Sequence, residues 1–261
     1  MKRIRLLLAA LAVTLLTLML VGCSEENKDS LSRVKEAGEV SFAMSGGYPP
    51  FNFYNDNNKL VGFDVDVANE VAKRIGVNFK PVTTEWSGII EGLRSGVYDG
   101  ILGSMAVTQK RLEVVNFSTP YYYSGAQLLV KKGAPFTAPD QLKGKIIGVV
   151  TGTTFATDAE KLGAGDVKLY KDDTHTLTEL NNGVVNGVIT DRVVGVNAMN
   201  SGKFNIALLG MPLRGEDIAV AFRKGDDSLL TKVNTILSAM HKDGTLSTLS
   251  QKWLKTDITV R

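Results

Sequence analysis

The distribution of hydrophobic residues divides the chain into a short apolar leader and a longer body. Residues 4–21 form an apolar run whose last charged residue is Arg5, and Lys2 and Arg3 add to the positive charge at its start. A basic start followed by an apolar run is typical of an export signal. A run of about 20 apolar residues is also long enough to span a bilayer, so a retained membrane anchor is an alternative. We expect the chain to be exported.

In the body, short apolar segments alternate with amphipathic ones. Residues 64–75 repeat apolar side chains at helical spacing, and Asp64 is placed to cap that helix. The same reasoning predicts helices at 89–94, from about Thr153, at 177–182 and at 228–243, and strands at 40–44, 78–82, 98–102, 128–131, 145–150, 167–170, 187–190 and 218–222. This alternation predicts an α/β architecture with mostly parallel sheets.

Two breaks in the series predict two lobes instead of one sheet. A loop at 135–140 opens a second strand and helix series, and a Pro- and Gly-bearing break at 210–215 precedes the last strand. We expect residues 31–124 and 217–261 to form the first lobe and residues 125–216 the second. Two crossing segments make a hinge, and ligands of open α/β sheets bind at the carboxyl ends of strands. The expected site is therefore a cleft between the lobes.

Aromatic residues stand in two of the strand-end loops. Tyr48 and Phe51 follow the first strand in a loop fixed by glycines and prolines, where each either faces a ligand or packs on its own lobe. Burial is favoured for Phe51, as is usual for an aromatic side chain. Trp86 lies in a loop beside Ser87 and Gly88, which is a poor position for a core residue, so we expect it to line the cleft.

Two charged residues stand at similar places. Arg111 lies three residues after Thr108, a candidate N-cap, and an Arg on the first turn of a helix is a good carboxylate receptor, although a solvated Arg is the alternative. Asp191 ends an apolar strand, where it either receives an ammonium group or caps the next helix. Thr153 and Thr154 offer hydroxyl and N–H donors at another strand-to-helix turn, or cap that helix.

The only cysteine of the chain, Cys23, ends the segment LVGC at residues 20–23. An aliphatic residue, a small residue and then Cys resemble a bacterial lipobox. The resemblance implies that residues 1–22 are removed as a signal peptide, that Cys23 is lipidated, and that residues 23–30 tether the body to the membrane. A soluble secreted protein with a chance cysteine is a further alternative.

The charge of the body gives no sign of a nucleic-acid partner. Residues 1–22 contain three of the 30 Lys and Arg and none of the 27 Asp and Glu, which leaves 27 of each sign. HExxH, Walker and GxSxG motifs are absent from the sequence, and His175 and His241 lack metal-ligand spacing. We therefore expect a monomer without cofactor, metal or nucleic acid.

Together these segments resemble the solute-binding proteins of polar amino-acid ABC transporters over nearly the whole chain. The matching stretches are YPPFNFYNDNNKLVGFDVDVANEVAKRIG (48–76), EWSGIIEGLRSGVYDGILGSMAVTQKR (85–111), NFSTPYYYSGAQLLV (116–130), LKGKIIGVVTGTT (142–154) and NGVVNGVITD (182–191). The resemblance implies a two-lobed periplasmic-binding-protein fold of type II. It also implies capture of a polar L-amino acid and its delivery to the permease of an ABC importer.

The resemblance further implies roles for individual residues. The α-carboxylate of the ligand would meet Arg111 and the α-ammonium Asp191, with an aromatic sandwich around the ligand's side chain. The remaining implied contacts are Tyr48 and Trp86 for the sandwich, Thr154 and the backbone around Ser104, Met105 and Ala106 for the carboxylate, and Ser45. Ser45 stands where relatives for cationic amino acids often have an acid, which argues against a Lys or Arg ligand.

An enzyme and a sensory component are the alternatives to a transport protein. Periplasmic dehydratases on the same fold resemble amino-acid binders, and fold alone does not settle function. An enzyme would need an acid or base such as Glu85 or Asp172, and neither belongs to a recognisable catalytic motif. We therefore expect a binding protein.

Overall fold

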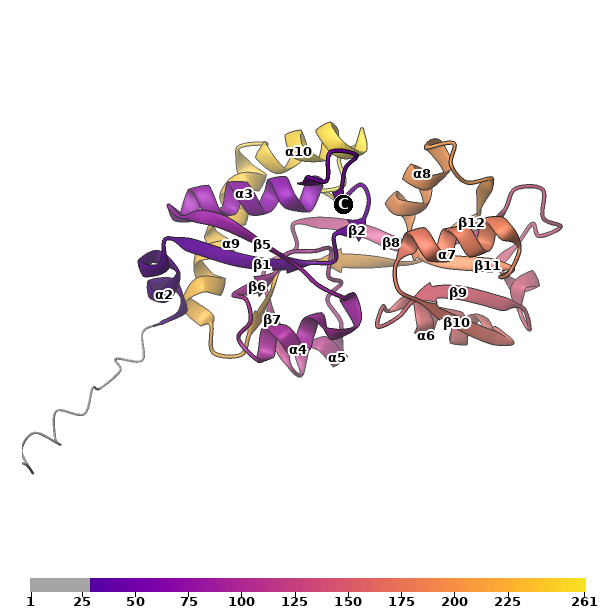
Figure 1. Ribbon diagram of the computed structural model, residues 1–261, viewed down its shortest axis with the longest axis horizontal. Helices are drawn as coiled ribbons and strands as arrows, with labels where there is room; N and C mark the ends of the chain where they lie inside the picture. Colours follow the sequence, from indigo (N-terminus) through magenta and orange to yellow (C-terminus); the bar gives the residue numbers. More distant parts are fainter. Residues whose placement is uncertain (1–28) are drawn as a thin grey trace, which may run out of the picture.

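Two five-stranded sheets form the centres of two lobes that lie next to each other along the longest axis of the molecule (Figure 1). The computed structural model describes residues 29–261. The predicted signal peptide, Cys23 and nearly all of the predicted tether lie outside the described residues. Within residues 29–261, no helix combines the length and the apolar character that a membrane span requires.

The first lobe is a mixed sheet covered by helices. Its strands, in sheet order, are β5 (Asn78–Thr83), β1 (Glu39–Met44), β6 (Gly100–Ile101), β13 (Ala221–Arg223) and β7 (Val115–Phe117). Strand β1 is parallel to β5 and β6, whereas β13 is antiparallel to β6 and β7. The helices are α2 (Ser30–Ala37), α3 (Phe63–Ile75), α4 (Ile89–Arg94), α5 (Gln109–Leu112), α9 (Asp227–Lys242) and α10 (Thr245–Leu254). A small sheet of β2 (Gly47–Tyr48), β3 (Asn52–Tyr54) and β4 (Leu60–Val61) and a 3-10 turn (Trp86–Gly88) complete the lobe.

The second lobe repeats this plan. Its strands, in sheet order, are β10 (Asp166–Tyr170), β9 (Ile146–Val150), β11 (Gly187–Asp191), β8 (Tyr122–Lys131) and β12 (Ile206–Ile218). The helices are α6 (Phe155–Leu162), α7 (Asp173–Asn182) and α8 (Arg192–Asn200), and a 3-10 turn (Pro139–Leu142) follows β8. Strands β9, β10 and β11 are parallel, but β8 is antiparallel to β11 and β12. Both sheets are therefore mixed, and not mostly parallel as predicted. The antiparallel pairs involve β8 and β13, which lie where the chain passes from one lobe to the other.

The long strands β8 and β12 connect the lobes (Figure 1). They pair antiparallel from Tyr122 opposite Ile218 to Ala126 opposite Arg214, with a register irregularity that begins after Leu209. The predicted lobe boundaries, at 124/125 and 216/217, fall within this paired region. Ala106 forms an additional antiparallel bridge with Ile218, which ties the loop before α5 to the connection between the lobes.

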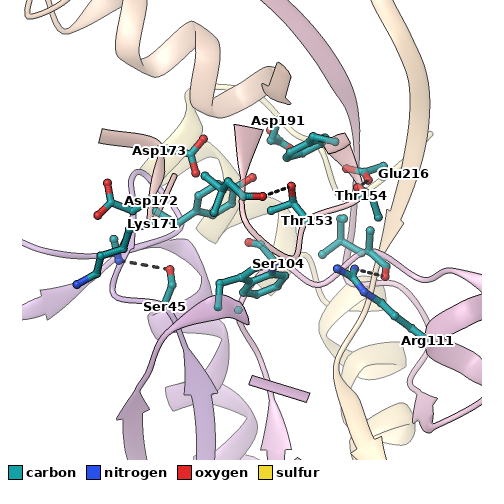
Figure 2. A pocket seen from close by; sticks show the side chains of 18 residues that line it. Ser45, Ser104, Arg111, Thr153, Thr154, Lys171, Asp172, Asp173, Asp191 and Glu216 are labelled. Carbon is teal, nitrogen blue, oxygen red and sulfur yellow. Dashed lines mark hydrogen bonds between the residues drawn. The ribbon is translucent and has the colours of Figure 1, made fainter. Parts of the chain in front are cut away.

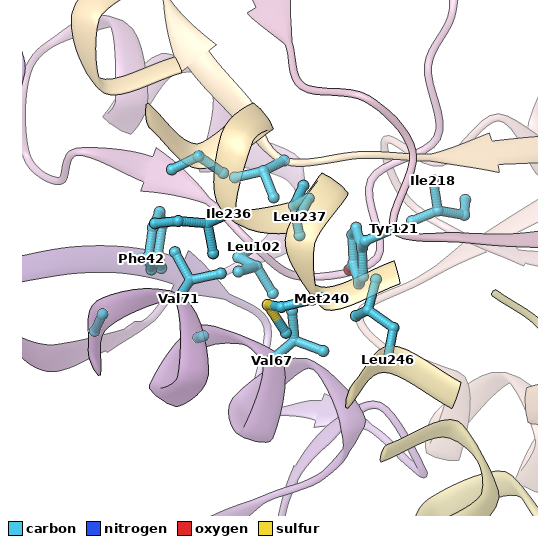
Figure 3. Packing of buried hydrophobic residues seen from close by; sticks show 14 of the residues in the cluster. Phe42, Val67, Val71, Leu102, Tyr121, Ile218, Ile236, Leu237, Met240 and Leu246 are labelled. Carbon is cyan, nitrogen blue, oxygen red and sulfur yellow. The ribbon is translucent and has the colours of Figure 1, made fainter. Parts of the chain in front are cut away.

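The core of the first lobe forms where α3 and α9 cover the sheet (Figure 3). Its buried side chains include Phe42, Val67, Val71, Leu102, Ile236, Leu237, Met240 and Leu246. Val67 and Val71 are one helical turn apart on α3, and both are fully buried. Burying one such side chain contributes roughly 1.5–3 kcal/mol, so this face holds α3 against the sheet and fixes the loops at the strand ends.

Two predictions about the elements were wrong. Asp64 does not cap α3: Gly62 is the N-cap, and the Asp64 carboxylate is fully buried among donors from other segments. The predicted strand at 218–222 is two strands, because Ile218 ends β12 in one sheet and Ala221 begins β13 in the other. One apolar run continues through both strands, so the pattern of the sequence does not separate them.

Gly62 permits the close approach of α3 to the loop that carries Tyr48. Its φ is +134°, and a Cβ at this position would lie 2.2 Å from the carbonyl oxygen of Phe51. Only glycine combines that backbone conformation with that contact. The residue therefore couples helix packing to the position of the binding-site loop.

We expect Gly62→Ala to lower the free energy of unfolding by about 3 kcal/mol or more, from backbone strain and the clash with Phe51. Gly76→Ala is the matched control, because its φ is also positive (+94°) but a Cβ there meets no described atom within 4 Å. The control should lose only about 1–2 kcal/mol. Urea unfolding followed by circular dichroism measures both values, and equal losses would show that the clash has no effect.

Candidate ligand-binding site

A cavity lies between the lobes, beside the carboxyl ends of the strands (Figure 2). The first lobe supplies Ser45, Gly47, Tyr48, Trp86, Gly103, Ser104, Ala106 and Arg111 to its lining; β12 and the second lobe supply Val150, Thr153, Thr154, Phe155, Lys171, Asp172, Asp173, Asp191, Glu216 and Ile218. The structure thus brings together the residues implied by the family resemblance, with Met105 as the exception.

Met105 does not line the cavity. Its side chain is fully buried in a cluster that includes Ile89 and Leu93, and its carbonyl oxygen accepts a hydrogen bond from the N–H of Ala219 at 3.1 Å. Removal of an apolar side chain from water is favourable, so Met105 belongs to the core of the first lobe.

Ser104 is held by a buried network centred on Asp64. The hydroxyl of Ser104 donates to Asp64 at 2.8 Å, and its N–H donates to the Tyr121 hydroxyl at 3.1 Å. Tyr121 in turn donates to Asp64 at 2.6 Å, and Asn52 donates to the same carboxylate at 2.7 Å. Burial raises the pKa of Asp64 to about 6 against these hydrogen bonds, which lower it. The N–H and the hydroxyl of Ser104 therefore both have protein partners.

Arg111 is a buried cation on the first lobe. Thr108 caps α5 and accepts a hydrogen bond from the Arg111 N–H at 3.2 Å, as predicted. The guanidinium donates to the carbonyl oxygen of Ala106 at 2.8 Å and lies 5.7 Å from the centroid of the Trp86 ring. Burial lowers the pKa of Arg111, but an Arg remains charged in such a site. The stacking contact and the hydrogen bond hold the guanidinium at the cavity.

Asp191 is a buried acid on the second lobe. It ends β11, is 1% exposed, and accepts a hydrogen bond from the Val193 N–H at 2.7 Å, so it also caps α8. Burial raises the pKa of Asp191 to about 7, and the charge of Glu216 adds to the increase. The carboxylate is therefore poorly stabilised in its charged form, and a cation beside it would be favoured.

The aromatic residues of the first loop have different roles. Phe51 is fully buried, as expected, and stacks between Tyr48 at 5.5 Å and Tyr122 at 5.0 Å between ring centroids. Tyr48 lines the cavity as well as stacking on Phe51. Burial raises the pKa of Tyr48 well above its ordinary value, and the carboxylates of Asp191 and Asp173 add to that increase. The phenol of Tyr48 therefore stays uncharged where it lines the cavity.

Glu216 is a site residue that the sequence analysis missed. It is 7% exposed and accepts hydrogen bonds from Thr154 and Arg214, both at 2.8 Å. Arg214 also binds Asp158 through two nitrogens, which pins β12 to α6. The hydroxyl of Thr154 is thus committed to Glu216, and that of Thr153 donates to a backbone carbonyl oxygen. Glu216 lies within β12, which crosses between the lobes, and not at a strand-to-helix turn. The rule that selected the other site residues therefore did not select it.

Lys171 and Asp173 were missed too, although they follow a predicted strand, and Asp172 between them was considered only for an enzyme. Asp173 is 5% exposed and accepts a hydrogen bond from Thr190, and burial raises its pKa to about 6. Lys171 forms an ion pair with Glu85 of the first lobe at 3.0 Å. The rule applied to the other strand ends would have selected this loop as well.

The residues considered for an enzyme have structural partners. Glu85 pairs with Lys171, and Asp172 caps α7 by accepting from the His175 N–H at 2.9 Å. His175 is largely exposed, and His241 is within 3.3 Å of the Pro120 carbonyl oxygen. Among residues 29–261, no group of His, Cys, Asp and Glu is arranged to hold a metal ion.

The cavity carries more acids than bases. Four carboxylates line it, those of Asp172, Asp173, Asp191 and Glu216, together with two cations, Arg111 and Lys171. Carboxylates that share one cavity repel one another, so a ligand with at least one cationic group suits the cavity.

The raised pKa values predict a pH dependence of stability. A carboxyl group whose pKa is higher in the folded protein binds more protons there than in the unfolded chain, so its contribution to stability is lost as pH rises from about 4 to its folded pKa. We expect the unfolding free energy of Asp191→Asn, relative to the unsubstituted protein, to increase between pH 4 and 7 by up to ~1.4 kcal/mol per pH unit. Urea unfolding without ligand measures this difference. The exposed Asp140→Asn is the control, and parallel profiles for all three proteins would contradict the raised pKa.

Comparisons with known proteins show the family to which the chain belongs. The family model of the bacterial extracellular solute-binding proteins, family 3, matches residues 40–256. The L-cystine-binding protein TcyJ of Escherichia coli is 36% identical over 256 residues, with 97% of this chain and 96% of that protein covered.

A solved structure of a mutant of ArgBP from T. maritima is 31% identical, covers 87% of this chain and 99% of that one, and has a TM-score of 0.82. An ancestral amino acid-binding protein, AncCDT-1, described as a precursor of cyclohexadienyl dehydratase, is 30% identical, covers 86% and 99%, and has a TM-score of 0.81. The chain belongs to the bacterial extracellular solute-binding proteins, family 3.

Proposed function

We propose that the protein captures an L-α-amino acid between its lobes and delivers it to the permease of an ABC importer. One observation carries the proposal: a buried cation of the first lobe, Arg111, and a buried acid of the second, Asp191, line the same cavity. The carboxylate and the ammonium group of an amino acid have the opposite charges in one small ligand. A zwitterion therefore satisfies both lobes together.

The ligand's charges fit the electrostatics of each residue. A carboxylate on Arg111 would receive two parallel N–H bonds from a guanidinium that Trp86 and the Ala106 carbonyl oxygen already orient. An ammonium group on Asp191 would favour the charged carboxylate, whose pKa burial raises to about 7. The remaining proposed contacts come from Ser45, Tyr48, Trp86, and the backbone of Ala106 and Thr154. Ser104 also lines the cavity, but its N–H and hydroxyl already bond Tyr121 and Asp64.

Binding of this kind favours closure of the lobes. Because the two charge partners lie on different lobes, contacts that need both of them are complete only when the lobes are close together. The paired strands β8 and β12 are the connection about which such a movement takes place. The ion pair between Glu85 and Lys171 also joins the lobes in the conformation described here.

Transport is favoured over catalysis. TcyJ is named as a binding protein, and AncCDT-1 is itself described as amino acid-binding, although it is a precursor of an enzyme. The acids that an enzyme would need at this cleft, Glu85 and Asp172, hold an ion pair and a helix cap. Neither side chain is placed as a free general base.

We also propose that the protein is a monomer anchored to the outer side of the cell membrane by a lipid on Cys23. The family is extracellular, which supports export. The segment LVGC at 20–23 supports the anchor, because its Cys follows a small residue at the end of an apolar signal.

The binding roles predict an order among three substitutions. Arg111→Ala and Asp191→Ala each strand a charge of the ligand in a buried site, so we expect affinity for the bound amino acid to fall by roughly 3–5 kcal/mol. Trp86→Ala removes contact area and leaves the ligand's charges paired, and it should cost less. Isothermal titration, with folding checked by circular dichroism, gives the order. Unchanged affinity in Arg111→Ala would place the carboxylate elsewhere.

The anchor predicts a specific covalent change. When the full chain is expressed in a bacterium supplied with radioactive palmitate, the unsubstituted protein should be labelled and Cys23→Ser should not. Ser24→Ala, one residue further along, should be labelled normally. Absence of label from the unsubstituted protein would support a retained anchor or a soluble secreted form.

A further inference from the structure

A second cavity lies on the other side of the connection between the lobes. It has a volume of about 740 Å³, which is in the range of small-molecule sites, and it shares no lining residue with the main cavity. The end of α10 and the segment after it, β8, β12 and α8 line it, and we call it the hinge cavity. Figure 1 shows α10 and α8 on one side of β8 and β12, whereas α5 and α6, which supply Arg111 and Phe155 to the main cavity, lie on the other.

The charged residues that line the hinge cavity are all cations. They are Arg192, Arg214 and Lys255, and none of the described lining residues is Asp or Glu. Arg214 is neutralised by ion pairs with two acids. Arg192 donates instead to the uncharged side chain of Gln127 at 2.6 Å, and Lys255 donates to a backbone carbonyl oxygen at 3.0 Å. Two cations with uncharged partners give the cavity a positive potential.

Both lobes also supply apolar surface to the hinge cavity. Trp253 and Leu254 line it from the first lobe, and Val193 and Val196 line it from α8 of the second lobe. Pockets of this composition, largely apolar with a few polar groups, are typical of small-molecule sites. A ligand with one anionic group and an apolar body therefore matches the lining in both respects.

We propose that the hinge cavity binds an organic anion that has a single carboxylate, sulfonate or phosphate group on an apolar body. Arg192 of the second lobe and Lys255 of the first lobe bind the charged group, and Trp253, Val193 and Val196 contact the body. An inorganic anion lacks the apolar contacts, and a neutral molecule of the same shape lacks the charged ones. The existence of this site does not depend on the function proposed above.

An occupant of the hinge cavity favours the conformation described here, in which the lobes are in contact. Glu85 and Lys171 pair across the main cleft, and a Cβ on Gly152 of the second lobe would lie 3.2 Å from the Cα of Ser87 on the first. Because β8 and β12 lie between the two cavities, a rotation that opens the main cleft brings α8 toward α10 and narrows the hinge cavity. A bound anion therefore opposes opening of the lobes. Its effect on amino-acid affinity rests on the proposed function.

Two fluorescent probes that differ by one charged group test the site. 8-Anilinonaphthalene-1-sulfonate has a sulfonate on an aromatic body, and N-phenyl-1-naphthylamine is the same body without the sulfonate. Fluorescence titration of the protein, without any amino acid, gives both affinities. We expect the sulfonate to bind about fivefold or more tightly than the neutral probe, because only the sulfonate forms charge-assisted hydrogen bonds with Arg192 and Lys255.

Substitutions locate the probe. Arg192→Gln and Lys255→Gln should each lower the affinity for the sulfonate about fivefold and leave that for the neutral probe unchanged, whereas Arg192→Lys keeps the charge and should lose less. Lys255 is exposed, so its substitution leaves the core intact, and the exposed Lys132→Gln, outside both cavities, is the matched control. Equal affinities for the two probes, or unchanged sulfonate affinity in Arg192→Gln and Lys255→Gln, would overturn the site, whether or not an amino acid binds the protein.

Small-angle X-ray scattering tests the effect on the lobes. Saturating 8-anilinonaphthalene-1-sulfonate should reduce the radius of gyration of the protein in the absence of amino acid, because the closed conformation is more compact. An unchanged or larger radius would overturn the link between the hinge cavity and closure. Failure of amino acids to bind in the main cavity would overturn the proposed function alone, since neither the probe titration nor the scattering measurement uses an amino acid.

Discussion

The buried carboxylate of Asp64 is the interaction on which the first-lobe half of the cavity depends. It accepts hydrogen bonds from Asn52, Ser104 and Tyr121, and so joins the start of β3, the loop after β6 and the residue before β8. The side-chain oxygen of Asn52 extends the network, since it accepts from the hydroxyl of Ser45 and the N–H of Gly46. Loops far apart in the sequence thereby take fixed positions around one buried acid, whose loss would leave several donors without a partner.

The second lobe has a hydrogen-bond network of its own at the cavity. Arg214 bonds Asp158 of α6 and Glu216 of the same strand, and Thr154 completes the group at the start of α6. Each wall of the cavity is therefore held by its own hydrogen-bond network. We propose that the angle between the lobes changes at the paired segment of β8 and β12, so that a ligand in contact with both walls acts directly on that angle.

The sequence predicted those cavity-lining residues that stand at strand ends and helix starts, and it missed those whose positions depend on contacts between distant segments. Asp191 ends a strand directly before a helix and Arg111 lies on the first turn of a helix, so the strand-end rule and the family resemblance both point to them. Asp64 also stands at a helix start, but its donors come from residues 52, 104 and 121, which no local pattern connects to it. Glu216 lies on a strand that crosses between lobes, where neither periodicity nor a turn marks its position.

The zwitterionic ligand that we propose matches the balance of charge in the cavity. Arg111 is already oriented by Trp86 and the Ala106 carbonyl oxygen, so little side-chain freedom is lost when it takes a carboxylate. Asp191 is destabilised in its charged form by burial and by Glu216, and an ammonium group relieves both effects. In the proposed complex, the anion site at Arg111 is therefore oriented before the ligand binds, whereas the charged form of Asp191 becomes favourable only when the ammonium group is beside it. Because each lobe supplies one of the two proposed sites, the proposed contact of the ammonium group with Asp191 favours closure of the second lobe on the first.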